Sequence, residues 1–237
     1  LQGGRSEQEN HIPQRVEEAK LFFKYSHLFG NNFFKYENYF RQFVNKGWSV
    51  KKVKDVENNY WKKFYEGFKN ITPSPFCMYV CENYDLKNKK VLELCCGNGR
   101  DSYYISKLCK QIVAVDKATK PSDIHNLRFI KKDISEFYDD NTEDFDLTYC
   151  RFGIHSIEEE VETKILENSN LLMLEFRSAK DDSYIEDHYR RKIDGSVFVK
   201  KLIDFNFELL YYKESKGLAV YKDEDPLIIR IIAKKRD

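Results

Sequence analysis

Short apolar runs alternate with helical patterns from about residue 89 to the end of the chain. The runs predict strands at 90–95, 112–116, 127–133, 144–150, 170–177, 207–215 and 225–235. Apolar residues at helical spacing predict helices at 100–109, 134–140, 156–168 and 197–205. Strands separated by helices require right-handed crossovers, so we expect an α/β fold with a doubly wound, mostly parallel sheet covered on both faces. The last two strands have no helix between them and are predicted to run antiparallel.

Residues 10–70 have a different pattern, polar, charged and aromatic, with helical spacing and a break near Gly47. The prolines within 72–75 end this helical region, because proline lacks an amide donor and biases the preceding residue away from helix. We therefore divide the chain into a helical N-terminal extension or lid, residues 1–72, and an α/β domain, residues 73–237. Tyr60, Trp61 and Phe64 lie on the last of these helices. They form either a lid over a ligand site or ordinary core, and both interpretations stay open.

Composition narrows the classes of function. Lys and Arg number 40 against 39 Asp and Glu, which argues against a protein whose main task is to grip a nucleic-acid backbone. No apolar run approaches the roughly 20 residues of a membrane helix, and the first residues lack the pattern of a secretory signal. The six cysteines show no repeated pair at zinc-ligand spacing, so we expect reduced thiols, no metal site and a cytoplasmic protein.

A glycine loop follows the first predicted strand, where residues 93–102 read ELCCGNGRDS. In a doubly wound sheet this strand-to-helix turn is where a ligand binds, and Gly97 and Gly99 let the backbone approach it closely. A dinucleotide site would need a third glycine at Ser102. Glu93 at the mouth of the loop repels a diphosphate and suits an amino group or a sulfonium instead.

Two further acids end the next two strands. Asp116 comes about 20 residues after the glycine loop begins and could accept hydrogen bonds from ribose hydroxyls. Asp133 could meet an adenine amino group, with Ile134 against the ring. Acids at these positions also cap helices, so a purely structural role remains the alternative.

This motif series resembles that of the class I S-adenosylmethionine-dependent methyltransferases over residues 73–237. The resemblance implies a seven-stranded sheet whose last strand is antiparallel, with S-adenosylmethionine as cofactor and S-adenosylhomocysteine as product. Cys95 stands where the family keeps the first glycine of its E/D-x-G-x-G-x-G motif. The cofactor-binding residues that the resemblance implies are Glu93, Cys95, Gly97, Asn98, Gly99, Arg100, Asp101, Asp116, Lys117, Asp133, Ile134, Cys150, Arg151 and Phe152.

More narrowly, the segments CGNGRDS, YCRFGIHSI, EFRSAKDD and DHYRRKID resemble a bacterial subgroup often encoded with capsule or surface-polysaccharide genes. This subgroup includes enzymes that O-methylate phosphoramidate decorations. The resemblance implies methyl transfer to an oxygen of a small anionic acceptor, which could be phosphorylated, nucleotide-linked or a phosphoramidate.

The segment after the fourth predicted strand bears on the acceptor. Many relatives that methylate amines carry Asn/Asp-Pro-Pro-Tyr/Phe there, whereas this chain has Cys150-Arg151-Phe152-Gly153-Ile154-His155. His155 is placed to take a proton from an acceptor hydroxyl at neutral pH. It is equally placed to cap the following helix as a neutral structural histidine.

A cationic cluster follows the fifth predicted strand. Guanidinium groups match phosphate oxygens in bidentate fashion, so an anionic substrate would contact Arg177, His188, Tyr189, Arg190 and Arg191, together with Tyr60 and Trp61. A solvated loop with ion pairs to Asp181, Asp182 and Asp187 is the alternative. Two other functions also stay open, namely a non-catalytic methyltransferase-like binding module and methylation of RNA or protein. The oligomeric state is left open.

Overall fold

The structure is a computed structural model that describes residues 60–67, 70–181 and 190–236. The chain divides into two compact units, Leu1–Asn58 and Asn59–Asp237, and every described residue belongs to the second. The helices predicted before residue 60 therefore lie outside the described residues. Our division at residue 72 stays a prediction.

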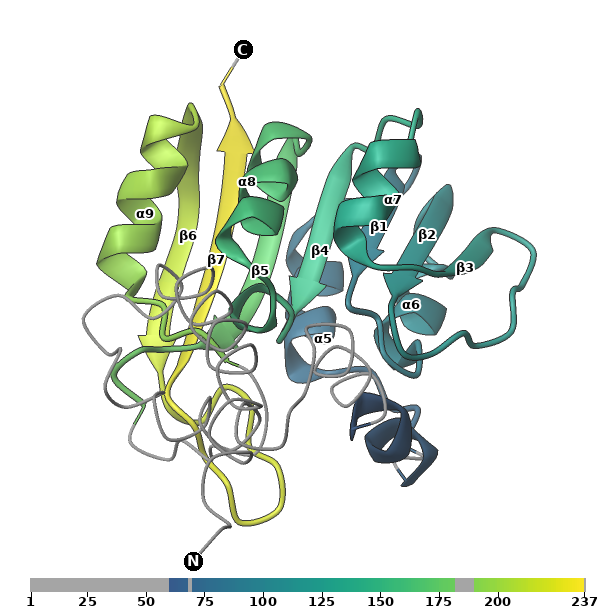
Figure 1. Ribbon diagram of the computed structural model, residues 1–237, viewed down its shortest axis with the longest axis horizontal. Helices are drawn as coiled ribbons and strands as arrows, with labels where there is room; N and C mark the ends of the chain where they lie inside the picture. Colours follow the sequence, from purple (N-terminus) through teal and green to yellow (C-terminus); the bar gives the residue numbers. More distant parts are fainter. Residues whose placement is uncertain (1–59, 68–69, 182–189, 237) are drawn as a thin grey trace, which may run out of the picture. The chain divides into compact units, whose positions relative to one another are not determined.

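A seven-stranded sheet forms the centre of this unit, in the order β3-β2-β1-β4-β5-β7-β6 (Figure 1). β7 is antiparallel to both of its neighbours, and the strands from β3 to β5 pair in parallel. The predicted fold class is thus confirmed. The strands are β1 (Lys90–Leu94), β2 (Gln111–Asp116), β3 (Leu127–Lys131), β4 (Leu147–Arg151), β5 (Leu171–Arg177), β6 (Phe207–Ser215) and β7 (Ile228–Lys235).

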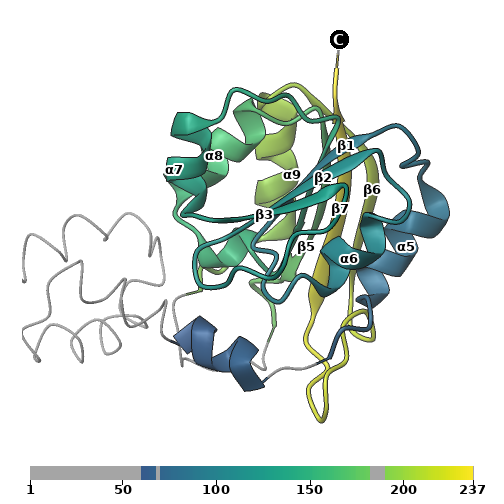
Figure 2. The same ribbon diagram turned by 90° about the vertical axis from the view of Figure 1, so that its right-hand side faces the viewer.

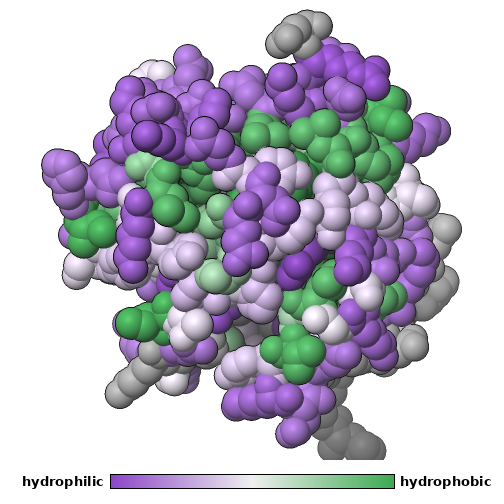
Figure 3. Space-filling model, turned by 180° about the vertical axis from the view of Figure 1, so that it is seen from behind, coloured by the Kyte–Doolittle hydropathy of each residue, from purple (hydrophilic) through white to green (hydrophobic). Residues whose placement is uncertain are grey.

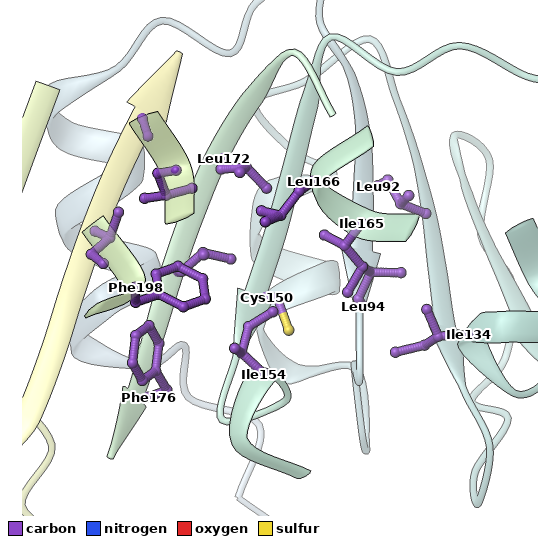
Figure 4. Close-up of a cluster of buried hydrophobic side chains, with 14 of the residues drawn as sticks. Leu92, Leu94, Ile134, Cys150, Ile154, Ile165, Leu166, Leu172, Phe176 and Phe198 are labelled. Atoms are coloured by element: carbon purple, nitrogen blue, oxygen red, sulfur yellow. The ribbon is translucent and has the colours of Figure 1, made fainter. Parts of the chain in front are cut away.

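Helices cover the sheet on both faces (Figures 1 and 2). One face carries α7 (Ile134–Asp140), α8 (Glu159–Glu167) and α9 (Gly195–Asp204), and the other carries α5 (Pro75–Asn83) and α6 (Arg100–Ile105). Each face has its own apolar cluster. In the larger one, Ile165 and Leu166 of α8 and Phe198 of α9 pack on side chains of β4 and β5 (Figure 4).

Burial on both faces explains why the strands read as continuous apolar runs in the sequence. The edge strand β6 departs from this pattern, because Leu209 and Leu210 are exposed. Seen from behind, the surface is largely hydrophilic with separate hydrophobic patches (Figure 3). Within the described residues, no helix is long and apolar enough to cross a membrane.

The sequence pattern did not predict α5. Its first turn begins where we expected helix to end, because Ser74 is the N-cap and its Oγ accepts a hydrogen bond from the Cys77 amide at 3.0 Å. Pro75 occupies the first helical position, where its missing amide costs nothing. Pro75 therefore starts a helix in the segment where we expected only an end.

Helix boundaries also differ from those expected. α6 ends at Ile105, short of the predicted residue 109. A short 3-10 helix, η2 (Ile154–Ser156), precedes α8, so the helix expected from residue 156 begins only at Glu159. The break leaves residues 152–158 as a connection at the carboxyl end of β4.

Candidate active site

The glycine loop leaves β1 through a run of left-handed backbone. Cys95, Gly97 and Gly99 have φ of 57°, 56° and 75°. Cys95 thus adopts a left-handed conformation that glycine takes freely, at a cost of about 1–2 kcal/mol for a residue with a Cβ.

Tyr65, which the sequence did not single out, lies directly on this loop. A Cβ added to Gly97 would come within 2.3 Å of the Tyr65 ring. Residues 60–67 form a helix, and Tyr65 stacks on Trp61 one turn earlier, with ring centroids 6.2 Å apart. Burial, followed by the charge of Asp116, raises the pKa of the Tyr65 hydroxyl. The spacing of Trp61 and Tyr65 on one helical face was the available signal.

The other aromatic residues of this helix that the sequence singled out pack against one another. Tyr60 packs edge-on against Trp61 at 5.2 Å, and Phe64 is 39% exposed. Tyr65 is thus the residue of this helix whose ring lies beside Gly97, and the role of Tyr60, Trp61 and Phe64 as a lid stays a prediction.

Asp116 at the end of β2 ties the loop to the strand that follows. Its Oδ2 accepts a hydrogen bond from the Gly97 amide at 3.0 Å, and its Oδ1 accepts from the amides of Ala118 and Thr119 at 2.8 and 3.0 Å. A carboxylate has about four acceptor positions. Three are used, so Asp116 keeps room at Oδ2 for one further donor, such as a ribose hydroxyl.

Asp133 caps α7, as the structural alternative supposed, and its Oδ1 accepts from the Ser135 amide at 2.9 Å. Ile134 is buried in the larger apolar cluster. Both residues lie beside the carboxyl end of β3. The cap occupies one carboxylate oxygen and does not conflict with the adenine contact that we predict.

Glu93 is a buried carboxyl group, 3% exposed, near the end of β1. Ser102 Oγ donates a short hydrogen bond to Glu93 Oε2. Ser102 thus binds the acid from the position where a dinucleotide site would have glycine. Burial, followed by the nearby charge of Asp101, raises the pKa of Glu93 well above its usual value.

Asp101 has a different environment from the other predicted cofactor residues. Its Oδ1 accepts from the Ser74 amide at 2.6 Å, and its Oδ2 accepts from Ser74 Oγ at 2.7 Å and from the Tyr149 hydroxyl at 2.9 Å. These bonds join α6 to the start of α5 and to β4. The structure therefore places Asp101 in the scaffold behind the loop.

The remaining predicted loop residues lie around it. The Asn98 side chain donates to the Asn70 carbonyl at 3.0 Å, and Arg100 Nε lies 3.8 Å from Asp101 Oδ1. Lys117 is half-buried next to Asp116. These residues follow the ends of β1 and β2 in the chain, and their contact with a cofactor stays a prediction.

Two thiols meet beneath the loop. The side chains of Cys95 and Cys150 form a hydrogen bond, which together with burial raises the pKa of Cys95 well above its usual value. A Cβ on Gly153 would lie 2.5 Å from Cys150 Sγ and 2.7 Å from Cys95 Sγ. The sulfurs thus fill the space beside Gly153. No group of three or more His, Cys, Asp or Glu side chains in the described part of the chain could hold a metal ion.

The end of β4 carries a stack of three side chains. Phe152 has a left-handed backbone with φ of 54°. The Arg151 guanidinium lies 4.3 Å from the centroid of its ring, and the His155 ring meets it edge-on at 5.9 Å. Strained non-glycine residues thus follow both β1 and β4, which are adjacent strands.

His155 is 3% exposed, and its Nδ1 accepts a hydrogen bond from the Arg177 amide at 3.4 Å. This bond favours the neutral tautomer with its proton on Nε2. In that tautomer Nε2 donates a hydrogen bond rather than accepting a proton. The role of base stays a prediction, and it requires the bond from the Arg177 amide to break.

Two arginines of the predicted cationic cluster, Arg177 and Arg191, are engaged in ion pairs. Arg177 reaches Asp181 at 3.1 Å and Glu224 at 2.7 Å. Arg191 forms a close pair with Glu162 and donates to the Ile154 carbonyl at 3.0 Å. The pair with Asp181 is one that the alternative named, but Asp181 is buried rather than solvated.

The other members of that cluster are only partly described. Arg190 is half-buried. His188 and Tyr189 lie outside the described residues. Direct contact of this cluster with a substrate stays a prediction.

Comparison with known proteins agrees with this geometry. A family model described as "Tellurite resistance protein TehB" matches residues 54–168. No curated protein matches the chain significantly. Among solved structures, the Burkholderia thailandensis 1,6-didemethyltoxoflavin-N1-methyltransferase, with bound 1,6-didemethyltoxoflavin and S-adenosylhomocysteine, is similar with a TM-score of 0.62 and 13% identity, covering 80% of this chain and 92% of that one.

Two further structures are similar. A methyltransferase from Anabaena variabilis that depends on S-adenosylmethionine has a TM-score of 0.57 and 16% identity, covering 78% of this chain and 95% of that one. TehB from Haemophilus influenzae has a TM-score of 0.55 and 17% identity, covering 76% and 67%. The chain therefore has the Rossmann-like fold found in S-adenosylmethionine-dependent methyltransferases.

Proposed function

We propose that this protein transfers a methyl group from S-adenosylmethionine. The observation that carries the proposal is the ordered set at the carboxyl ends of neighbouring strands, formed by Glu93, the glycine loop and Asp116. A cationic adenosyl donor fits this set, because Glu93 is a buried acid and Asp116 keeps one acceptor position. The similarity to the TehB family and to methyltransferase structures supports the same donor.

The residues of the site bind and orient their ligands, while the donor itself supplies an electrophilic methyl group on sulfur. Asp116 fixes the Gly97 amide and orients a ribose hydroxyl. Glu93 stabilises a positive charge near the end of β1. Tyr65 covers Gly97, so a ligand that approaches the loop displaces this ring, which can then pack against the ligand and exclude water. Alignment of the two reactants is the main contribution of the protein.

For the acceptor we propose an oxygen of a small anionic precursor of a surface polysaccharide, methylated in the cytoplasm. The resemblance of the segments around residues 95, 150 and 177 to the capsule-associated subgroup supports this class. The tautomer of His155 also supports it, because an ionised phosphate-type oxygen needs a hydrogen-bond donor rather than a base. Replacement of the Pro-Pro segment by Arg151–Gly153 removes one argument for amine acceptors.

Calorimetric titration with S-adenosylmethionine and S-adenosylhomocysteine tests the donor. We expect both to bind, and Asp116→Asn to weaken binding at least about tenfold because it loses a charged acceptor. Asp140→Asn, at an exposed carboxylate paired with Lys132, is the matched control and should leave affinity unchanged. If neither ligand binds the wild-type protein, the enzyme proposal is wrong.

A screen of phosphorylated sugars, nucleotide-sugars and phosphoramidates for cofactor turnover tests the acceptor. His155→Ala separates the two roles of the imidazole. A large loss of kcat with donor affinity intact would identify a base and a hydroxyl acceptor, whereas a small loss would favour an ionised acceptor. Donor binding without turnover of any acceptor, RNA and protein included, would favour the non-catalytic module.

A further inference from the structure

Two arginines share one buried carboxylate across three neighbouring strands. Glu175 of β5 is fully buried, and its Oε1 accepts from Arg151 Nε of β4 at 2.8 Å. Its Oε2 accepts from Arg230 Nε of β7 at 2.6 Å. The three residues are direct register partners across the sheet, Arg151 opposite Glu175 and Glu175 opposite Arg230. The ladder is therefore built into the strand pairing.

This ladder carries one positive charge in excess, because two guanidinium groups face one carboxylate. Asp101 also acts on Arg151, but Arg100 lies 3.8 Å from Asp101 and offsets its charge. Glu93 on the adjacent strand has a raised pKa, which disfavours its charged form. Burial opposes the charge of Arg151, yet the attraction of Glu175, Tyr149 and Asp101 leaves its pKa above the ordinary value. An uncompensated buried charge is costly unless a partner completes it.

Arg230 has little capacity for that partner. Its guanidinium lies 5.3 Å from the ring centroid of Phe76 and 5.9 Å from that of Tyr79, and its Nη2 donates to the Leu218 carbonyl at 2.9 Å. Its side chain is 7% exposed. A ligand that compensates the excess positive charge would therefore bind at the other end of the ladder, at Arg151.

Arg151 is at that end. Its Nε is fixed by Glu175 and one face of its guanidinium lies over Phe152, but Nη1 and Nη2 make no hydrogen bond within the described residues. The side chain is 18% exposed. It follows Cys150, the register partner of Leu94 before the glycine loop, and its charge acts on Tyr65. A rigid pair of donors therefore stands beside the candidate active site.

We propose that Nη1 and Nη2 of Arg151 bind an oxyanion of phosphate type on the methyl acceptor. Glu175 and Arg230 act as positioning residues that hold the guanidinium in place. The assignment to the acceptor rests on the proposed methyltransferase function. It differs from the role in cofactor binding that the family resemblance implies for Arg151.

Inorganic phosphate is the probe, titrated into the full chain saturated with S-adenosylhomocysteine and followed by calorimetry or by ³¹P NMR. We expect Arg151→Gln to weaken phosphate binding about tenfold or more, the loss of a bidentate charge-assisted contact. Affinity for S-adenosylhomocysteine should stay within about twofold. Arg128→Gln, at a surface arginine paired with Glu143, is the matched control and should change neither affinity.

Arg151→Gln removes a partner of the buried Glu175 and so lowers stability. Arg151→Lys keeps the charge but loses the paired Nη1 and Nη2 donors. This variant should fold and still bind phosphate several-fold more weakly. The proposal is overturned if both variants bind phosphate like the wild type, or if the loss appears in S-adenosylhomocysteine affinity instead. Absence of phosphate binding in a wild-type protein that binds S-adenosylhomocysteine would overturn the inference and leave the methyltransferase proposal standing.

Discussion

Alanine substitutions at three left-handed glycines separate the cost of the backbone from the cost of packing. Gly97, Gly99 and Gly217 have φ of 56°, 75° and 76°. A Cβ at Gly217 would meet nothing within 4 Å, whereas at Gly97 it would meet the Tyr65 ring and at Gly99 the Phe129 ring. The three variants therefore share the conformational penalty and differ in what must move.

The magnitudes follow from how freely each ring can move. In Gly217→Ala the left-handed backbone destabilises the folded state, while the less flexible unfolded chain offsets part of this effect. We expect the free energy of unfolding to fall by about 1 kcal/mol. Gly97→Ala displaces the far end of the Tyr65 ring, which belongs to a half-buried side chain, so we expect the free energy of unfolding to fall by about 1–2 kcal/mol. Gly99→Ala places the Cβ 2.5 Å from the ring of Phe129, which is 2% exposed. Overpacking of a fixed core side chain raises the loss to about 2–5 kcal/mol.

Urea denaturation followed by tryptophan fluorescence and circular dichroism measures these differences, provided the m-values agree. A double-mutant cycle with Tyr65→Ala adds a second readout. In that background, Gly97→Ala should cost about as much as Gly217→Ala, while the cost of Gly99→Ala stays unchanged. If Gly99→Ala destabilises no more than Gly217→Ala, or if Tyr65→Ala does not reduce the cost of Gly97→Ala, the packing of the loop is not as described.

Three further predictions concern buried groups around the loop. Asp101→Asn should lower the free energy of unfolding by about 2–4 kcal/mol in urea titrations, because an amide cannot accept from all three buried donors. Gly153→Ala should cost about 1–3 kcal/mol in the same assay, because its Cβ overlaps the sulfurs of Cys95 and Cys150. Affinity for S-adenosylmethionine should rise as the pH rises through the raised pKa of Glu93, because a bound cation favours the carboxylate form. Calorimetry should show proton release on binding at lower pH. Glu93→Gln should remove this pH dependence.

The sheet could be predicted because its central strands are buried on both faces, so that nearly every position in them is apolar and the runs are short and bounded. The helix α5 could not, because the Ser-Pro pair that we interpreted as the end of a helix supplies the N-cap and first residue of a new one. Local sequence shows that a break occurs there. Whether a helix follows depends on the contacts of Phe76 and Val80 with the sheet, which only the tertiary structure provides.

The acids of the site could be placed for a related reason. Parallel strands end at one edge, so acids that end successive strands come together whatever else the chain does. Their partners could not be read in this way. Asp101 bonds to Ser74 and Tyr149, which are 27 and 48 residues away in the sequence, and Tyr65 reaches Gly97 from a helix outside the sheet. Contacts of this kind depend on how separate elements pack together, and the hydrophobic periodicity of the sequence does not predict that packing.

The two ends of the site have opposite electrostatic deficits. At β1, Glu93 is a buried acid with a raised pKa, and a positive charge beside it would stabilise its carboxylate form. At β4, Arg151 shares its carboxylate with Arg230 and lacks one negative charge. Methyl transfer from a sulfonium to an oxyanion removes one positive and one negative charge. Under the proposed function the sulfonium compensates the charge of Glu93, and the oxyanion compensates the charge of Arg151. A neutral acceptor would leave the charge at Arg151 uncompensated. The same two residues that bind the reactants thereby select them by sign, without a base having to take part.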